Sequence, residues 1–466
     1  MGLLVRDVFE YIKKSYILLV VFLLVILGIY VIGLPQITIN FLFLVLFSIL
    51  FIFKKYDLIL FLFVTLLPTN GFVNTEYNIL GIVNSKYIIS LFSLISAILL
   101  DKQIKNNYKL DELAKFGFYI IVFVSAYLIF QNYKVNQLGI QEISILKFIT
   151  RFIKASIDAI VLFYIIKFSN LSYYKLYFQK AFFVSLLLIA LSMIFAGSLY
   201  ELGVYMGDES RFQTGEENQR LWGIWGFGGG GDVNTIGGFL VMGLSCVLFS
   251  LKKTPWIMVF ILILGIMVTG SRTAFVNLSI VFVAFMLFGA GSVSKKMKRI
   301  CWIVIFVFIL FQIGVFDFVI ERIMLLVTGE DEGLDADGVG RLSGWIWYLN
   351  YIMSDLDVFL WGTSNNIYEV SSFAGFLKNR PAHNFYIQLW YFFGVFALSI
   401  FLYLIIRLCR IVLKSTQKVQ IFLILPALIT LFTVSEVGVL FYIPIVLVLF
   451  TRSNFNLDQK KYVYEK

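Results

Sequence analysis

His383 is the only histidine in the sequence, and its type and place make it a candidate for proton transfer. It stands where a polar stretch meets an apolar one, within residues 381–390. Because a neutral imidazole accepts a proton near neutral pH, His383 could deprotonate an attacking hydroxyl group. The positive charge of Arg380 would keep the imidazole neutral. The alternative is a surface histidine, or a neighbour of a helix N-cap, with no chemical role.

Arg272 is the second candidate, because it lies in a short turn between two apolar runs, within residues 269–275. A guanidinium at a membrane boundary is costly unless an anion accompanies it. Its planar fork of hydrogen-bond donors matches the oxygens of phosphate or pyrophosphate. The alternative is an interfacial anchor whose charge reaches the lipid headgroups.

Arginines and aromatic rings recur in the segment that precedes the apolar run beginning near Asn234. Arg211 and Arg220 could neutralise phosphate, and the flat face of Trp222 could stack on a sugar ring. The glycine run 228–231 would let a polar ligand approach the start of a helix. The segment is not a nucleotide-binding fingerprint, because no strand precedes it. The alternative is a flexible interfacial loop with an aromatic belt.

A third arginine with aromatic neighbours, Arg341, lies in a second long polar segment. The spacing of Trp345 and Tyr348 predicts one face of a short amphipathic helix on the membrane, and stacking on a sugar is an equal alternative. The pairs Asp335 with Asp337 and Asp355 with Asp357 resemble carboxylates that hold a divalent metal. Such pairs are common in solvated loops, and other converging ligands are absent, so we expect no metal and no cofactor.

The composition predicts an all-α, polytopic integral membrane protein. The chain is 60% hydrophobic and 14% charged, and its mean hydropathy is +0.90. The net charge of +10 comes from basic clusters between apolar runs, as the positive-inside rule requires, so no nucleic-acid partner is expected. The three cysteines fall in apolar runs without a pairing pattern, and we interpret them as structural and free.

Apolar runs divide the chain into about fourteen spans, within a range of about twelve to fourteen, and residues 16–34 are interpreted as a retained first helix. Basic clusters recur after every second span, which predicts that both termini are cytoplasmic. Residues 201–232 and 321–382 then become the large external loops. We divide the chain into an N-terminal bundle (1–200), a core (201–410) and C-terminal helices with a cytoplasmic tail (411–466).

Three segments, in this order, resemble the O-antigen polymerase and ligase superfamily of bacterial envelope glycan assembly. Its members carry an SRxA-type turn and an HN-containing helix start in a late hydrophobic domain. The similar segments here are residues 270–274, residues 341–347 with 361–363, and residues 382–389, together with Asn234 and Gly394. The resemblance covers residues 200–410. Residues 391–393 are aromatic where members often carry an acid, so no second carboxylate is expected there.

The resemblance implies glycosyl transfer, in a GT-C-like architecture, on the outer face of a bacterial inner membrane. The donor would be an undecaprenyl-pyrophosphate-linked glycan, and no metal need take part. Arg272, with Arg211 or Arg220, would hold the pyrophosphate, and His383 would orient or deprotonate the acceptor hydroxyl. Arg341 would bind the donor or the glycan. The remaining substrate-binding residues would be Trp222, Arg380 and Asn384.

Two activities fit this resemblance, and a polymerase that extends a lipid-linked chain is favoured over a ligase that attaches a finished chain to lipid A core or protein. Membrane lipid would surround either enzyme, and a chain-length regulator and a flippase are candidate partners. A lipid-linked oligosaccharide flippase or other transporter is the third alternative. It is disfavoured because no internal repeat is visible, and Lys154 and Asp158 can simply pair as neighbours one helical turn apart.

Overall fold

The structure is a computed structural model of the 466-residue chain, and most of the residues that it describes are helical. The described residues are 36–66, 85–104, 112–137, 145–201, 212–213, 220–221, 233–250, 255–269, 271–289, 292–312, 341–363, 384–414, 418–431 and 442–450. Two short strands among them, β1 (Phe212–Gln213) and β2 (Arg220–Leu221), pair antiparallel. For the described residues, the predicted all-α class is confirmed.

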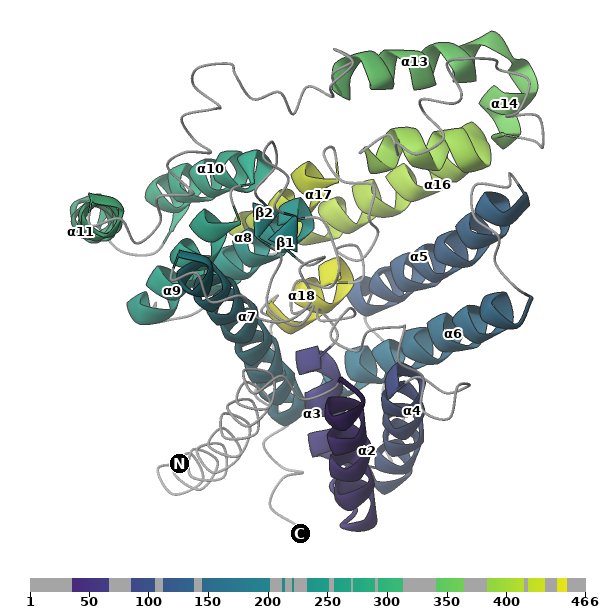
Figure 1. The fold of residues 1–466 in the computed structure, drawn as a ribbon, viewed down its shortest axis with the longest axis horizontal. Coiled ribbons are helices and arrows are strands. Elements are labelled where there is room, and N and C mark those ends of the chain that lie inside the picture. Colours follow the sequence, from purple (N-terminus) through teal and green to yellow (C-terminus); the bar gives the residue numbers. More distant parts are fainter. Residues whose placement is uncertain are drawn as a thin grey trace.

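The helices of the first half pack against one another in a bundle (Figure 1). They are α2 (Gln36–Ile52), α3 (Tyr56–Leu66), α4 (Ser85–Ile104), α5 (Glu112–Gln137), α6 (Ile145–Phe168) and α7 (Ser172–Glu201). Helix α4 contacts α2, α3 and α6, and α7 contacts α3. Long apolar sequences without a strongly polar face are what a membrane-embedded bundle requires.

The second half of the chain supplies both long and short helices. They are α8 (Val233–Ser250), α9 (Trp256–Val268), α10 (Arg272–Phe288), α11 (Val293–Gln312), α13 (Arg341–Ser354), α14 (Leu356–Trp361), α16 (Phe385–Lys414), the 3₁₀ helix η5 (Lys418–Leu423), α17 (Leu425–Thr430) and α18 (Tyr442–Phe450). Helices α13 and α14 lie over the first part of α16 (Figure 1). Helix α18 lies in the middle of the molecule and contacts α5, α6, α7 and α8.

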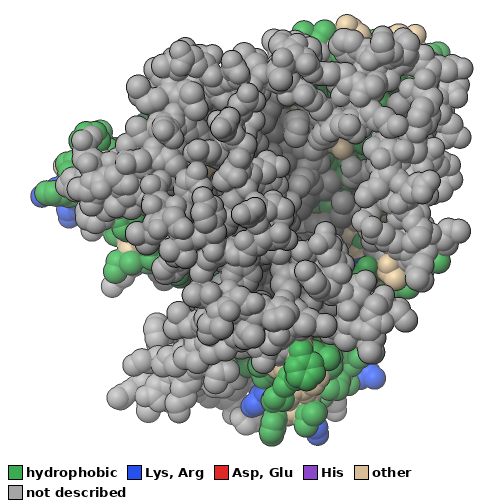
Figure 2. Space-filling view, in the orientation of Figure 1, with side chains coloured by type: hydrophobic (Ala, Val, Ile, Leu, Met, Phe, Trp, Pro, Cys, Tyr) green, Lys and Arg blue, Asp and Glu red, His purple; other side chains and the backbone are tan. Residues whose placement is uncertain are grey.

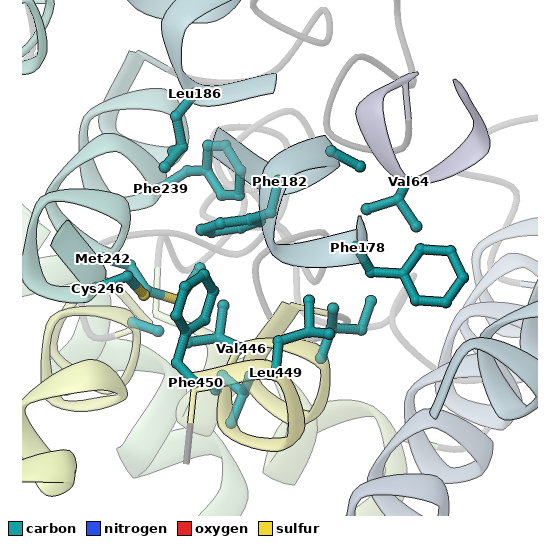
Figure 3. Close-up of a cluster of buried hydrophobic side chains, with 14 of the residues drawn as sticks. Val64, Phe178, Phe182, Leu186, Phe239, Met242, Cys246, Val446, Leu449 and Phe450 are labelled. Carbon is teal, nitrogen blue, oxygen red and sulfur yellow. The ribbon is translucent and has the colours of Figure 1, made fainter. Parts of the chain in front are cut away.

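The core joins the two halves through aromatic side chains (Figure 3). The ring of Phe182 in α7 lies 5.7 Å from that of Phe239 in α8 and 5.5 Å from that of Phe450 in α18, both edge to face. Cys246 is fully buried beside them. In a bilayer such close packing holds helices together, because lipid is as apolar as the side chains. All three cysteines are free, as the sequence predicts.

Among the described residues, three helices are long and apolar enough to cross a membrane, by length and composition. These stretches are Tyr87–Ile104, Ser172–Leu191 and Phe385–Lys414, and four shorter apolar helices accompany them, at Tyr56–Leu66, Ile236–Ser250, Trp256–Val268 and Thr273–Phe288. The count of about fourteen spans stays a prediction. The expected first helix, residues 16–34, lies outside the described residues.

Hydrophobic side chains dominate the described surface, and basic side chains gather at two edges (Figure 2). Lys54 and Lys55 are exposed in the turn that leads from α2 to α3, and Lys295 and Lys298 are exposed in α11. Lysines at the ends of apolar helices are typical of a membrane protein.

Candidate functional site

The sequence predicts a tight turn between α9 and α10, and the described residues of this turn, Thr269 and Ser271, are buried and hydrogen-bonded. The hydroxyl of Ser271 accepts a hydrogen bond from the backbone N–H of Ala274 at 3.2 Å and caps α10. The hydroxyl of Thr269 accepts from the backbone N–H of Ser271 at 3.3 Å and donates to the Ile266 carbonyl at 2.6 Å. Arg272 is therefore the first residue of α10, and its side chain lies outside the described part of the structure.

The first turn of α8 packs directly against this turn. A Cβ atom on Gly237 would lie 2.6 Å from the Cβ of Ala274 and 3.2 Å from Oγ1 of Thr269, so only glycine allows this approach. The part of α8 around Gly237 and the turn before α10 therefore lie side by side.

The start of α16 is fixed by Asn384, which is 3% exposed. Its Oδ1 accepts hydrogen bonds from the backbone N–H groups of Tyr386 at 3.1 Å and Ile387 at 3.2 Å, as a helix N-cap does. This capping uses the oxygen of Asn384, and the substrate-binding role stays a prediction. His383 lies outside the described residues. In the chain it immediately precedes the N-cap residue Asn384, so the alternative of an N-cap neighbour without a chemical role stays open.

The short helix α17 connects the start of α16 with α10. The N–H of Phe385 donates to the carbonyl of Leu431 at 2.8 Å, just past the end of α17. On the other side, Nδ2 of the fully buried Asn277 in α10 donates to Oγ1 of Thr430 at 3.1 Å and to the Pro426 carbonyl at 3.2 Å. These bonds hold α10 and α16 to the same short helix.

Helix α8 reaches α17 as well. A Cβ atom on Gly238 would overlap the side chain of Thr430, so the two helices approach closely at this glycine. The N-terminal ends of α8, α10 and α16 therefore gather around α17. Each helix start carries a partial positive charge, which favours a nearby anion.

Sequence reasoning did not find α17, which lies within the predicted C-terminal segment 411–466 rather than in the predicted core. Its residues carry no motif that would mark them. The one local signal is Pro426 near the start of the helix, a position that suits proline.

Helices α13 and α14 form a small aromatic layer on α16. The ring of Tyr348 lies 4.9 Å from that of Tyr391, edge to face, and Nε1 of Trp390 donates to the Phe359 carbonyl at 3.1 Å. The predicted helix around Tyr348 is confirmed. The predicted use of Tyr348 on a membrane or sugar face is wrong, because Tyr348 is buried against α16, where burial raises its pKa to about 12.

Two glycines join this layer to α16 at a kink. Gly394, inside α16, has a φ of 76°, and Gly362, after α14, has a φ of 82°; both angles favour glycine. A Cβ on Gly394 would overlap the backbone of Leu360, and one on Gly362 would overlap the backbone of Phe392. The Thr363 N–H donates to the Tyr391 carbonyl at 2.8 Å, replacing a helical bond that the kink breaks.

The remaining predicted site residues are placed only in part. Arg220 pairs with Gln213 in the β1–β2 ladder, and Arg341 begins α13, while the side chains of both arginines lie outside the described part. Three further predicted residues lie outside the described residues altogether: Arg211, Trp222 and Arg380.

The described residues do not support a metal site at the aspartate pairs. Asp355 caps α14 by accepting a hydrogen bond from the Asp357 N–H at 2.8 Å, and the other pair, Asp335 with Asp337, lies outside the described part. A search for three or more clustered histidine, cysteine, aspartate or glutamate residues found none among those described.

A comparison with protein families matches residues 257–402 to the family described as O-antigen ligase. These residues form an O-antigen ligase family domain. The match begins in α9, contains the turn at Arg272 and the start of α16 at Asn384, and ends in the middle of α16. The predicted membership of the O-antigen polymerase and ligase superfamily is confirmed, over a narrower range than the resemblance suggested. Searches of curated proteins and of solved structures gave no match.

The match over residues 257–402 supports an O-antigen processing enzyme of a bacterial membrane, glycosyltransferase-like, from a family that uses lipid-linked glycans. Two of the three segments that carry the resemblance have described residues near α17, namely 271–274 at the start of α10 and 384–389 at the start of α16. Helices α8 and α17 lie outside the matched residues. Both contact α10, and residues 425–431 also accept hydrogen bonds from Phe385 and Tyr386 at the start of α16.

Proposed function

We propose that this protein is a polysaccharide polymerase of O-antigen, capsule or exopolysaccharide assembly. It transfers a glycan chain from undecaprenyl pyrophosphate to the next lipid-linked repeat unit on the outer face of the bacterial inner membrane. In this proposal both termini are cytoplasmic, and a chain-length regulator and a flippase are partners. The reaction needs no metal, because arginines neutralise the pyrophosphate.

The observation that carries the proposal is the position of Arg272 as the first residue of α10. The helix dipole disfavours a cation at a helix N-terminus by roughly 0.3–1 kcal/mol. An anion bound at the start of α10 removes this conflict, because it is attracted both by the dipole and by the guanidinium. The first part of α8 packs against the turn before α10, and the start of α8 adds partial positive charge near it.

The chemistry follows from this arrangement. An acceptor hydroxyl oxygen attacks the anomeric carbon of the donor glycan, and the bond from that carbon to the pyrophosphate oxygen breaks. The pyrophosphate lipid leaves as an anion, which Arg272 stabilises together with Arg211 or Arg220. His383 takes the proton of the acceptor hydroxyl. Arg341, Arg380, Trp222 and Asn384 bind the donor or the glycan.

Ligation is the second candidate, and the description of the matched family favours it. A ligase would use the same donor and the same leaving group, and only the acceptor would differ. The two elaborated external segments, residues 201–232 and 321–382, suit an enzyme that holds a growing chain as well as a second lipid-linked substrate. For this reason we favour the polymerase.

Transport of a lipid-linked glycan is the least supported alternative, because two of the three charged residues considered for it, Lys154 and Asp158, are paired. The side chain of the third, Arg151, lies outside the described part of the structure. Lys154 contacts the carboxylate of Asp158 in the same helix, and the hydroxyl of Ser90 in α4 donates to that carboxylate at 2.6 Å. Asp158 is 8% exposed. These contacts join α6 to α4, and a buried pair of this kind has a structural role.

One experiment separates the three functions. Purified protein in lipid nanodiscs is incubated with a single lipid-linked repeat unit, and the products are resolved by size. A product ladder supports the polymerase, and reaction only after addition of a core acceptor supports the ligase. If a fluorescent lipid-linked glycan crosses the bilayer of proteoliposomes without extension, the enzyme proposal fails. Full activity in the presence of a chelator is expected, and loss of activity would refute metal independence.

A further inference from the structure

We propose that residues 425–431, which we call the α17 bridge, set the separation between the turn at Arg272 and the start of α16. Asn277 and Thr430 are the positioning residues of this bridge. This inference rests on the proposed function, and it assigns a role in the reaction to a segment that lies outside the matched O-antigen ligase family residues 257–402.

The bridge is fixed to α10 by buried side chains. Asn277 and Thr430 are both fully buried, and their hydrogen bond of 3.1 Å joins residues far apart in the sequence. The Thr430 hydroxyl also donates to the Pro426 carbonyl at 2.8 Å, which orients it as an acceptor toward Asn277. Asn277 follows Arg272 by little more than one helical turn, so this bond fixes the end of α10 that carries the arginine.

The bridge is fixed to α16 on its other side by the backbone. The N–H of Phe385 donates to the Leu431 carbonyl at 2.8 Å, and the hydroxyl of Tyr386 donates to the Leu428 carbonyl at 3.2 Å. Phe385 is the second residue after His383. One short helix therefore holds the segment that follows His383 and, through Asn277, the helix that begins at Arg272.

A group-transfer reaction needs this separation to be constant, because the acceptor oxygen and the leaving group must lie on opposite sides of one carbon atom. A displacement of about 1 Å at a site remote from the chemistry can reduce the rate about 100-fold. Loosening the bridge should therefore reduce kcat. Donor binding, which depends on the arginines and helix starts, should change little.

The first test compares Thr430→Val, which removes the hydroxyl at nearly constant volume, with Thr430→Ser, which keeps it. Thr65→Val is the matched control, since Thr65 is also buried and donates to the Phe61 carbonyl at 2.9 Å, far from α17 in the contact between α3 and α7. We expect kcat of Thr430→Val to fall about 10- to 100-fold, with donor KM within about twofold of wild type. Thr430→Ser and Thr65→Val should stay near wild-type kcat.

A second readout does not need activity. The three native cysteines are replaced by alanine, and spin labels are attached at Val276→Cys in α10 and Ile387→Cys in α16. Pulsed electron paramagnetic resonance then measures the distribution of distances between the two labels. Thr430→Val should broaden this distribution, and Thr65→Val should not. An unchanged distribution, or wild-type kcat in Thr430→Val, would overturn the positioning role. If the wild-type protein shows no transfer activity while Thr430→Val still broadens the distance distribution, the proposed function is refuted and the positioning role of the bridge is not.

Discussion

At the scale of single residues, Arg272 gives the most direct test of the site. The change Arg272→Ala should abolish chain extension while leaving the unliganded protein as stable as before, or more stable by a few tenths of a kcal/mol, because a cation leaves the start of α10. Arg272→Lys should also be strongly impaired, since a point charge cannot reproduce the two-pronged guanidinium. Glycan length on gels and thermal unfolding in detergent measure the two effects. Normal chain length in the lysine variant would indicate simple anchoring.

His383 should contribute to the chemical step and less to donor binding. We expect His383→Ala to reduce kcat by roughly 100- to 10,000-fold, which is the usual contribution of a general base. Donor KM should stay within about threefold of wild type. Steady-state kinetics with purified protein and a lipid-linked repeat unit provide the measurement. Full-length glycan from cells that carry only this variant would remove His383 from the site.

Residue types predict the chemistry of the site, but they do not tell which of the predicted side chains also have a structural role. Asn384 was predicted to bind substrate, and its Oδ1 caps α16, because the first N–H groups of any helix need acceptors. Tyr348 was predicted on an exposed face, and it packs on Tyr391. Sequence spacing gives the face of a helix, and it does not tell which partner covers that face.

At the scale of elements, the kink at Gly394 depends on two glycines with left-handed backbone. Gly394→Ala should lower the free energy of unfolding by roughly 2 kcal/mol or more, because the added Cβ is strained at a φ of 76° and overlaps the backbone of Leu360. Thermal unfolding in detergent measures this loss. Ser279→Ala is the control, since Ser279 is exposed and the change adds no atom to the interior. Equal unfolding temperatures for the two variants would contradict this account of the kink.

Several elements were predictable from the sequence, and the reasons are local. The turn before α10 combines Thr269, Ser271 and a glycine, and the helix of α13 follows the spacing of its aromatic residues. Helix α17 was not predictable, because it is six residues long and depends on contacts from α8, α10 and α16. The kink in α16 falls in an apolar run that reads as continuous helix, and the backbone of α14 is needed to explain it.

At the scale of the whole molecule, the predicted topology places the C-terminus in the cytoplasm. Green fluorescent protein fused after Lys466 should therefore fluoresce, whereas alkaline phosphatase fused there should be inactive. A cysteine at Asp337, in the predicted external loop, should react with a membrane-impermeant maleimide added to whole spheroplasts. If the fusions place the C-terminus in the cytoplasm but the cysteine at position 337 does not react, the spans between residue 337 and the C-terminus must be arranged differently.

Composition predicted the membrane class of the molecule, because 60% hydrophobic residues cannot be covered in a soluble chain of this size. The number of spans is harder to derive. Helix α9, with 13 residues between the described Pro255 and Thr269, is shorter than a bilayer is thick, so hydropathy alone cannot tell a span from a partly inserted helix.

The central position of α18 has a consequence for biosynthesis. Helices α5 and α7 leave the ribosome hundreds of residues before α18, yet all three share one interior, where Nε2 of Gln179 donates to the Leu449 carbonyl and Phe450 packs on Phe182. The interior of the nascent protein therefore stays incomplete until α18 has been synthesised. Chains that end at residue 431 should be degraded within minutes in a pulse-chase experiment, whereas chains that end at residue 455 should persist. Quality control of this enzyme would then act on the insertion of α18.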